Sequence, residues 1–122
     1  MSQRQFLGSC AEQMARTYLE QNELSLIQQN YRCYHGEIDL IMQDKEDIVF
    51  VEVRSRSESG YGKAIESIGS SKIRKLIKTA THYLQKRDLL NHRNSRFDIV
   101  TIDFLSEVPQ IDWIKNAFWD RG

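Results

Sequence analysis

Three acidic side chains interrupt two apolar runs near the middle of this chain. The first run, GEIDLI, carries Glu37 and Asp39, and the second run, FVEVR, carries Glu52 followed two residues later by Arg54. Carboxylate oxygens are the ligands that hard divalent cations prefer, and a guanidinium group can bind a phosphate oxygen with two hydrogen bonds. This combination of side chains is therefore suited to metal-assisted chemistry on a phosphate ester.

The pairing of the two runs determines whether these acids meet. Isoleucine, valine and phenylalanine fill both runs, which is typical of β-strands, and DKED between them predicts a four-residue turn at 44–47. With that turn, Asp39 lies opposite Glu52, and Glu37 lies opposite Arg54. Directly opposed residues have Cβ atoms about 5 Å apart. We therefore expect the three acids and the arginine to converge on one face of a hairpin.

Two opposed carboxylates destabilise a sheet unless a positive charge lies between them. Mg²⁺ or Mn²⁺ would supply that charge, and such an ion can polarise a phosphoryl oxygen and activate a water molecule. Two simpler explanations stay open at this point. Acids on a half-exposed sheet face are often only solvated, and Glu37 with Arg54 would form a cross-strand ion pair that contributes little to stability.

Asp39, a gap of about a dozen residues and then Glu52-Val53-Arg54 on the next strand is similar to the PD-(D/E)xK nuclease motif. The chain resembles, over nearly its whole length, the YraN-like proteins, a bacterial family regarded as having a restriction-endonuclease-like fold. The stretches GEIDLI and FVEVR carry the resemblance most specifically. Further matches are Gly8, Glu12, the AxxYL segments at 15–19 and 80–84, Lys72, RFD at 96–98 and NAF at 116–118.

The resemblance implies a metal-dependent nuclease scaffold related to Holliday-junction resolvases. It assigns Asp39 and Glu52 as metal ligands and Glu12, on the first helix, as an additional acid that reaches the site. Glu37 belongs to the family stretch, but its role is left open. Arg54 stands where the superfamily has a lysine, and arginine cannot act as a base because it stays protonated. This substitution bears on catalytic rate more than on phosphate binding.

A strongly basic segment follows the hairpin in the sequence. From Gly69 to Arg87 there are six basic residues and no acid. A solvated helix face is the ordinary explanation, but such faces usually mix both signs of charge. We therefore predict contact with nucleic acid through the backbone or shape of the ligand, with strong salt dependence. The residues expected to make this contact are Lys72, Arg74, Lys75 and Lys78 on the helix and Arg56 at the end of the preceding strand.

The elements that position these side chains follow from periodicity. Helices are predicted over 5–22 and from Ser70 or Ser71, as the cap, to about Arg87; strands are predicted over 24–32, 37–43, 48–54 and 96–105 and briefly around QIDWI; a loop is predicted over 57–69 and a turn or short helix at KNAFWD. Short turns favour antiparallel pairing, and the long connection over 56–95 allows one parallel pair. The expected fold is a restriction-endonuclease-like α/β domain, with a mixed central sheet flanked by helices.

Alternation along the hairpin strands assigns each side chain to a face. In the first strand one face is expected to hold Glu37, Asp39 and Ile41, and the other Ile38, Leu40 and Met42. In the second strand one face is expected to hold Phe50, Glu52 and Arg54, and the other Val49, Val51 and Val53.

Composition sets the outer limits of function. The 122 residues fit one nuclease-like domain over 1–122, and the formal net charge is zero, although residues 51–90 carry nine basic and four acidic side chains. Two cysteines and the absence of an apolar leader or a membrane-length apolar run favour a cytoplasmic protein that does not bind membranes.

The function expected from the sequence is metal-dependent hydrolysis of phosphodiester bonds in DNA, including branched DNA. The alternative is a module on the same fold that binds nucleic acid or protein without turnover. A homodimer is among the expected assemblies.

Overall fold

The chain forms two helices and five strands. The computed structural model describes residues 3–56, 69–90 and 93–118. In chain order the elements are α1 (Gln3–Gln21), β1 (Ser25–Cys33), β2 (Gly36–Asp44), β3 (Asp47–Arg56), α2 (Ser70–Lys86), β4 (Ser95–Asp103) and β5 (Gln110–Phe118). The predicted order of helices and strands is therefore confirmed.

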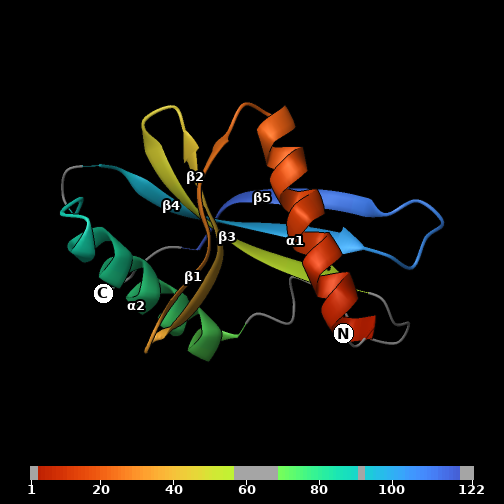
Figure 1. Cartoon of the computed structure of the whole chain (residues 1–122), viewed down its shortest axis with the longest axis horizontal. Coiled ribbons are helices and arrows are strands. Elements are labelled where there is room, and N and C mark those ends of the chain that lie inside the picture. The colour runs from red at the N-terminus through yellow and green to blue at the C-terminus, as the bar shows by residue number, and fades with distance from the viewer. Residues whose placement is uncertain (1–2, 57–68, 91–92, 119–122) are drawn as a thin grey trace.

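The five strands make one mixed sheet in the order β1-β2-β3-β4-β5. The pairs β1–β2, β2–β3 and β4–β5 are antiparallel, whereas β3 and β4 are parallel and are joined by the connection that contains α2. Figure 1 shows the two helices well apart, on either side of the twisted sheet. This mixed sheet flanked by helices is the expected α/β architecture, and it is compatible with a restriction-endonuclease-like fold.

Each helix buries its apolar stripe on a different side of the sheet, which produces two cores. The α1 core joins Ala11, Ala15 and Leu19 to strand residues such as Val49 and Val100. The α2 core joins the helix residues Leu76, Ala80, Tyr83 and Leu84 to Tyr31, Ile38, Ile41, Ile48 and Phe50 of the sheet. Because both faces are covered, the central parts of β2 and β3 are continuously apolar, over Leu40–Met42 and Ile48–Val51.

The hairpin register is as predicted near its turn. Gln43 pairs with Ile48 and Ile41 pairs with Phe50. The turn itself is shorter than predicted, because Asp44 already pairs with Asp47 and only two residues lie between them. The first of these, Lys45, has a φ of 57°, a left-handed conformation that suits tight hairpin turns.

The face assignment fails at one point in β2. Ile38 lies in the α2 core with Ile41, whereas Leu40 and Met42 lie in the α1 core, so the prediction that Ile38 shares a face with Leu40 was wrong. The assignment in β3 holds for its apolar residues: Val49 and Val51 lie in the α1 core, Val53 packs against it, and Phe50 lies in the α2 core.

An irregularity opposite Asp39 explains this failure. The ladder pairs on either side place Asn30 of β1 across from Asp39. Asn30 has a φ of 52°, a left-handed conformation that asparagine tolerates better than most residues. This residue interrupts the pleat of β1, and the alternation of β2 fails beside it, between Leu40 and Ile38. The break lies at the acid that the sequence assigns to chemistry.

The ends of two other elements also differ from expectation. Gly69 is the N-cap of α2 and makes no side-chain cap hydrogen bond, so neither Ser70 nor Ser71 caps the helix as predicted. Strand β5 continues to Phe118, so the predicted turn or short helix at KNAFWD was wrong over its described part. The predicted loop over 57–69 lies outside the described residues except for Gly69. Neither helix of the described chain is long and apolar enough to cross a membrane.

Candidate metal centre

Asp39 lies where β2 separates from β3. The ladder between these strands ends at the pair Leu40–Val51, so Asp39 has no backbone partner on β3. A side-chain contact replaces the missing ladder bond, because the backbone N–H of Val53 donates to Asp39 Oδ2 at 2.9 Å. The predicted backbone pairing of Asp39 with Glu52 is therefore not made. The carboxylate instead lies in the opening between the two strands.

Three carboxylates converge from α1 and β2. Glu12, Glu37 and Asp39 each have an oxygen within 4.8 Å of the others. Glu12 lies on α1 at the margin of its buried stripe. It precedes the buried Ala15 by about one helical turn, so α1 packing on the sheet brings its carboxylate to the two acids of β2. With its amide oriented to donate, Asn30 bonds Glu37 Oε1 at 2.9 Å and Glu12 Oε1 at 3.1 Å. The asparagine that breaks the pleat thus also holds two of the acids.

Glu52 of β3 is a further carboxylate near this group: its oxygens are not among those within 4.8 Å of one another, but the charges of Asp39 and Glu37 act on it. Only 6% of the residue is exposed. Its Oε1 atom lies 3.5 Å from Arg54 Nε and 3.9 Å from Lys72 Nζ. Its Oε2 atom is buried and has no hydrogen-bond partner among the described residues. A buried carboxylate oxygen without a partner is costly, so it marks a place where the folded chain lacks a positive charge or a donor. We call Glu12, Glu37, Asp39 and Glu52 the acidic cluster.

Burial raises the pKa values of three members of the acidic cluster, Glu12, Asp39 and Glu52, and neighbouring negative charge adds to the rise. Burial, followed by the charge of Asp39, raises the pKa of Glu52 to about 7, although Lys72 and Arg54 oppose this change. Burial and then Asp39 likewise raise the pKa of Glu12 to about 7. Burial raises the pKa of Asp39 itself, and the hydrogen bond from Val53 opposes that rise. Near neutral pH the cluster therefore carries less negative charge than four ordinary carboxylates would.

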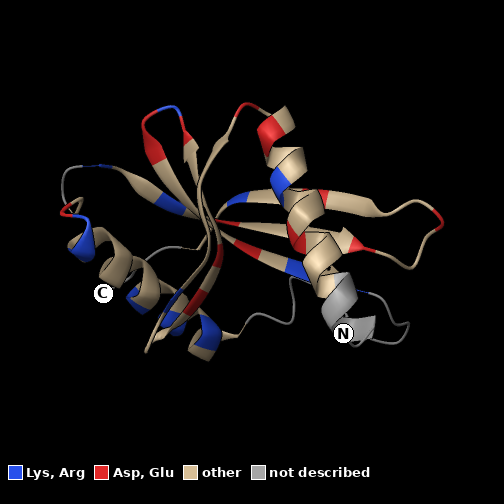
Figure 2. Ribbon diagram, in the orientation of Figure 1, with Lys and Arg blue, Asp and Glu red and all other residues tan. Residues whose placement is uncertain are grey.

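The predicted cations fall into two groups. Arg54 and Lys72 border Glu52, whereas Arg74 and Lys78 line a separate hollow on the outer side of α2. Lys75 is exposed on the same helix, and Arg56 is half-buried at the end of β3. Figure 2 shows lysines and arginines recurring along the α2 ribbon. The basic helix is thus adjacent to the acidic cluster at its N-terminal end and extends away from it.

The predicted ion pair between Glu37 and Arg54 is not among the contacts of the described chain. Glu37 instead pairs across the β1–β2 ladder, where its Oε2 lies 3.3 Å from Arg32 Nε. Arg32 is largely exposed, so this pair contributes little to stability. Glu37 therefore stands at the rim of the acidic cluster, between Arg32 on one side and Asp39 on the other.

Sequence reasoning missed two contributions to this site. Asn30 was given no role, although an asparagine inside a predicted strand is a weak signal for an irregular backbone. Lys72 was expected only to contact nucleic acid, yet its ammonium lies 3.9 Å from Glu52 Oε1. Its approach depends on how α2 crosses the sheet, which spacing along the chain does not reveal.

A second set of buried charges lies elsewhere in the sheet and is fully partnered. Asp98 is completely buried and accepts hydrogen bonds from Arg96 Nε at 3.0 Å, Trp113 Nε1 at 2.9 Å and the Asn116 backbone N–H at 3.0 Å. Arg96 also donates to Asp44 Oδ2 at 2.9 Å. These contacts join β2, β4 and β5, so we assign this Arg96–Asp98 network to stability.

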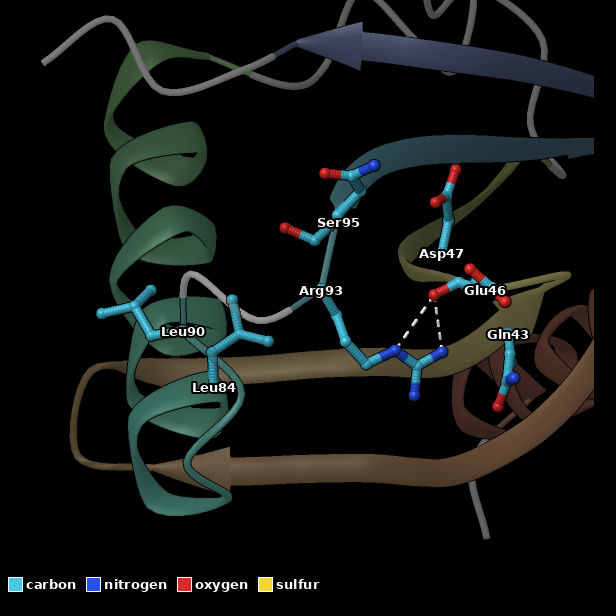
Figure 3. A pocket seen from close by; sticks show the side chains of 8 residues that line it. Gln43, Glu46, Asp47, Leu84, Leu90, Arg93 and Ser95 are labelled. Atoms are coloured by element: carbon cyan, nitrogen blue, oxygen red, sulfur yellow. Dashed lines mark hydrogen bonds between the residues drawn. The ribbon is translucent and has the colours of Figure 1, made fainter.

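A polar hollow of about 790 Å³ lies at the opposite end of the hairpin, around the β2–β3 turn and the start of β4. Figure 3 shows Arg93 reaching across it to the backbone carbonyl of Glu46, which it bonds through Nε at 3.0 Å and Nη2 at 2.7 Å. The guanidinium group is already engaged, and Asp44 of this region serves the Arg96–Asp98 network. Its two lining acids, Glu46 and Asp47, are exposed and half-buried, so neither is a buried carboxylate like Glu52.

The sequence that carries these acids and cations matches a known protein family. The model of the uncharacterised protein family UPF0102 matches residues 11–102. The chain belongs to this family. The matched range contains the whole acidic cluster together with Arg54 and Lys72. The resemblance to the YraN-like proteins that the sequence suggested is thereby confirmed.

Curated relatives match over nearly the full chain. A UPF0102 protein of Legionella pneumophila (strain Philadelphia 1) is 47% identical over 115 residues, which cover 94% of this chain and 95% of the relative. A UPF0102 protein of Ectopseudomonas mendocina is 45% identical over 118 residues, covering 97% and 98%. A UPF0102 protein of Nitrosomonas eutropha is 47% identical over the whole length of both chains. At this identity and coverage, the relatives agree with membership of the UPF0102 family.

Proposed function

We propose that this protein is a divalent-metal-dependent endonuclease that hydrolyses phosphodiester bonds in DNA, including branched DNA. The acidic cluster would hold Mg²⁺ or Mn²⁺, with Asp39 and Glu52 as ligands and Glu12 as a further acid. Arg54 and Lys72 would hold the phosphate of the substrate.

The observation that carries the proposal is the unpartnered Oε2 atom of Glu52. This buried oxygen belongs to a carboxylate whose pKa is raised by the charge of Asp39. A structural carboxylate at this depth would normally have donors on both oxygens, as Asp98 does. Carboxylate oxygens cluster from α1 and β2, with Glu52 of β3 near them, and oxygen donors of this kind are what Mg²⁺ and Mn²⁺ prefer. The residues present therefore fit a hard divalent cation.

The chain's own residues divide the remaining work. A divalent cation bound here would polarise a phosphoryl oxygen and activate a water molecule. Arg54, which is always protonated, would stabilise charge on the phosphate rather than accept a proton. The backbone N–H of Val53 fixes one oxygen of Asp39 at 2.9 Å and so orients the carboxylate towards the opening between β2 and β3. Lys72 brings a second cation to the same edge of the cluster.

A second function is favoured by one specific residue. Because Arg54 replaces the lysine of the superfamily pattern, the site lacks a base at that position, and a module that binds DNA or protein without turnover would keep the same fold. Such a module would retain metal and phosphate affinity through the acidic cluster and α2. It would differ from a nuclease only in turnover.

The test is cleavage of a labelled four-way DNA junction and a matched linear duplex with Mg²⁺, Mn²⁺ or EDTA. We expect metal-dependent products from the wild type and a large loss of them in Asp39→Asn and Glu52→Gln. Asp112→Asn, which alters an exposed acid on β5, is the matched control and should cleave normally. Cleavage that persists in Asp39→Asn would contradict the assigned site, and DNA binding without cleavage on any substrate would favour the module.

A further inference from the structure

A hollow of about 490 Å³ lies between the β1–β2 turn and the outer side of α2. Its walls combine aromatic rings and basic side chains, and no acidic residue lines it. The lining residues are Tyr34, His35, Arg74, Ile77, Lys78, Thr81, His82 and Gln85. We call this the aromatic hollow. None of its residues belongs to the acidic cluster.

Tyr34 presents an open aromatic face in the aromatic hollow. The residue is 88% exposed, although tyrosine is a large hydrophobic side chain. His35 lies against one side of its ring, with ring centroids 4.0 Å apart and planes inclined by 36°. This contact orients the Tyr34 ring and leaves its other face to solvent. An oriented, solvent-facing aromatic ring is the arrangement on which a planar base stacks.

A buried residue fixes the opposite wall. Tyr31 is 7% exposed, and its hydroxyl shares a hydrogen bond of 2.5 Å with His82 Nδ1. The Tyr31 ring is itself held edge-on against Tyr83, with centroids 5.2 Å apart. His82 is therefore anchored to the α2 core through a buried partner, and Nε2 is the ring nitrogen left to meet a ligand. Its ring lies 6.4 Å from that of Tyr34 and nearly perpendicular to it.

The charge of the aromatic hollow is uniformly positive. Arg74 and Lys78 are both exposed and lie one helical turn apart on α2. No acid accompanies them between Gly69 and Arg87. Basic groups beside a stacking platform match the two chemical parts of a nucleotide, which are its phosphate and its base.

The aromatic hollow and the acidic cluster are joined by α2. The helix passes close to the β1–β2 turn, since a Cβ atom at Gly36 would lie 3.2 Å from Thr79 Oγ1. Gly36 also has a φ of 153°, which other residues rarely adopt. Lys72, at the start of the helix, reaches Glu52 of the acidic cluster. From Lys72 to Lys78 the helix rises about 9 Å, and the two side chains point about 120° apart around its axis. One strand of a few nucleotides can therefore pass from the acidic cluster to the hollow by curving around α2.

From this arrangement we infer that the aromatic hollow binds one nucleotide of single-stranded DNA, with the base stacked on Tyr34 and neighbouring phosphates held by Arg74 and Lys78. The inference rests on the proposed nuclease function for its choice of DNA, and it specifies the substrate further. The preferred substrate would carry a single-stranded segment within a few nucleotides of the bond that is cleaved.

The first test measures binding of a fluorescein-labelled dT20 oligonucleotide by anisotropy in EDTA. Tyr34→Ala should weaken binding about five- to hundredfold, because stacking on one aromatic ring is lost. Tyr34→Phe keeps the ring and should bind within about twofold of the wild type. Binding of a blunt 20-base-pair duplex should be the same in all three proteins. Tyr34 is exposed, so the substitution does not threaten the fold.

A salt titration separates the base contact from the phosphate contacts. Two phosphate contacts to a single strand contribute about 1.4 to the slope of log K against log salt concentration. The double variant Arg74→Ala with Lys78→Ala should lower the slope for dT20 by that amount, whereas Tyr34→Ala should leave the slope unchanged. Lys45→Ala, which removes one charge at the distant β2–β3 turn, is the control and should leave it unchanged too.

The two proposals fail in different ways. Unchanged dT20 binding in Tyr34→Ala, an equal loss for duplex and single strand, or no dT20 binding by the wild type would overturn the aromatic hollow as a nucleotide site, even if junction cleavage depends on Asp39. Conversely, a Tyr34→Ala defect confined to dT20, in a protein that cleaves nothing with any metal, would support the hollow and reject the nuclease.

Discussion

Glu52 and Asp98 are both buried carboxylates on the central strands, yet their surroundings are opposite. Asp98 accepts hydrogen bonds on both oxygens from Arg96, Trp113 and the backbone of Asn116. Glu52 has two cations near Oε1 and no partner for Oε2 among the described residues, and the charges of Asp39 and Glu37 act on it. Both oxygens of Asp98 therefore have hydrogen-bond donors, whereas one oxygen of Glu52 has none among the described residues.

This difference separates a structural charge from a binding charge. A buried acid whose acceptors are all used stabilises the fold and gains nothing from a ligand. A buried acid with an unused acceptor, among other acids, costs stability until a cation arrives. We therefore predict that substitutions in the acidic cluster weaken cation binding and cleavage, whereas substitutions in the Arg96–Asp98 network lower the free energy of unfolding.

The largest effect is expected on cleavage. Asp39→Asn or Glu52→Gln should reduce metal-dependent cutting of a labelled junction roughly a thousandfold, because loss of the cation removes several kcal/mol of transition-state stabilisation. Urea unfolding of the same variants should show no loss of stability in EDTA. A cleavage-dead variant that is also strongly destabilised would mean that the acid holds the fold together, as Asp98 does.

The reverse result is expected at the Arg96–Asp98 network. Asp98→Asn places an amide N–H₂ where an acceptor of several donors stood, and it leaves the Arg96 guanidinium without one of its two closest carboxylates. Breaking a buried pair in this way should lower the free energy of unfolding by about 3 kcal/mol. Mn²⁺ affinity of the folded fraction should stay at the wild-type value. If Asp98→Asn has the same free energy of unfolding as the wild type, the network does not stabilise the fold and the comparison with Glu52 fails.

The pH dependence of stability should carry the signature of Glu52. Its pKa is raised from an ordinary 4.5 to about 7, so between these values the folded protein binds a proton that the unfolded chain releases. Without a cation, this contribution to stability is fully present below about pH 4.5 and is lost as pH rises through 7.

Urea unfolding in EDTA at pH 5 and pH 8 measures this contribution. Between these pH values the free energy of unfolding of the wild type should fall by on the order of 2 to 3 kcal/mol more than that of Glu52→Gln. The difference between the two proteins removes the contribution of the groups that they share. Equal pH dependence in the two proteins would show that Glu52 titrates normally.

The smallest effect is expected at Lys72. This ammonium lowers the pKa of Glu52, so Lys72→Met should raise that pKa and move Mn²⁺ binding to higher pH. Lys72 is partly exposed, so the pH midpoint should move by only about 0.2 to 0.7 of a unit. Lys75→Met, an exposed lysine on the same helix, is the control. A midpoint that moves equally in both variants would point to a general charge effect of α2.

Much of the fold follows from local patterns. Helical spacing of Ala11, Ala15 and Leu19 predicts α1, and the hairpin register near its turn follows from the length of the polar stretch. The parallel β3–β4 pair follows from a connection too long for a hairpin. The helix and the hairpin register depend on residues close together in the sequence, the parallel pair depends on the length of the connection, and all three are confirmed.

The arrangement of the site depends on contacts that spacing does not encode. The hairpin register predicts that Asp39 pairs with Glu52, but the ladder ends at Leu40–Val51, opposite the left-handed Asn30 of the neighbouring strand, and the Asp39 carboxylate accepts from Val53 instead. Strand β5 extends beyond prediction because Asn116 adopts a φ of 51° and donates its backbone N–H to Asp98. In both cases a left-handed asparagine is stabilised by a partner from another strand, which a single sequence does not show.

The most direct test of the central claim is calorimetric titration of Mn²⁺ into the wild type, Glu52→Gln and Asp112→Asn at pH 8. We predict saturable binding to the wild type and to Asp112→Asn, and at least about tenfold weaker binding to Glu52→Gln. If the three proteins give the same isotherm, or if the wild type gives no binding heat, the buried oxygen of Glu52 does not await a cation and the hydrolytic proposal is contradicted.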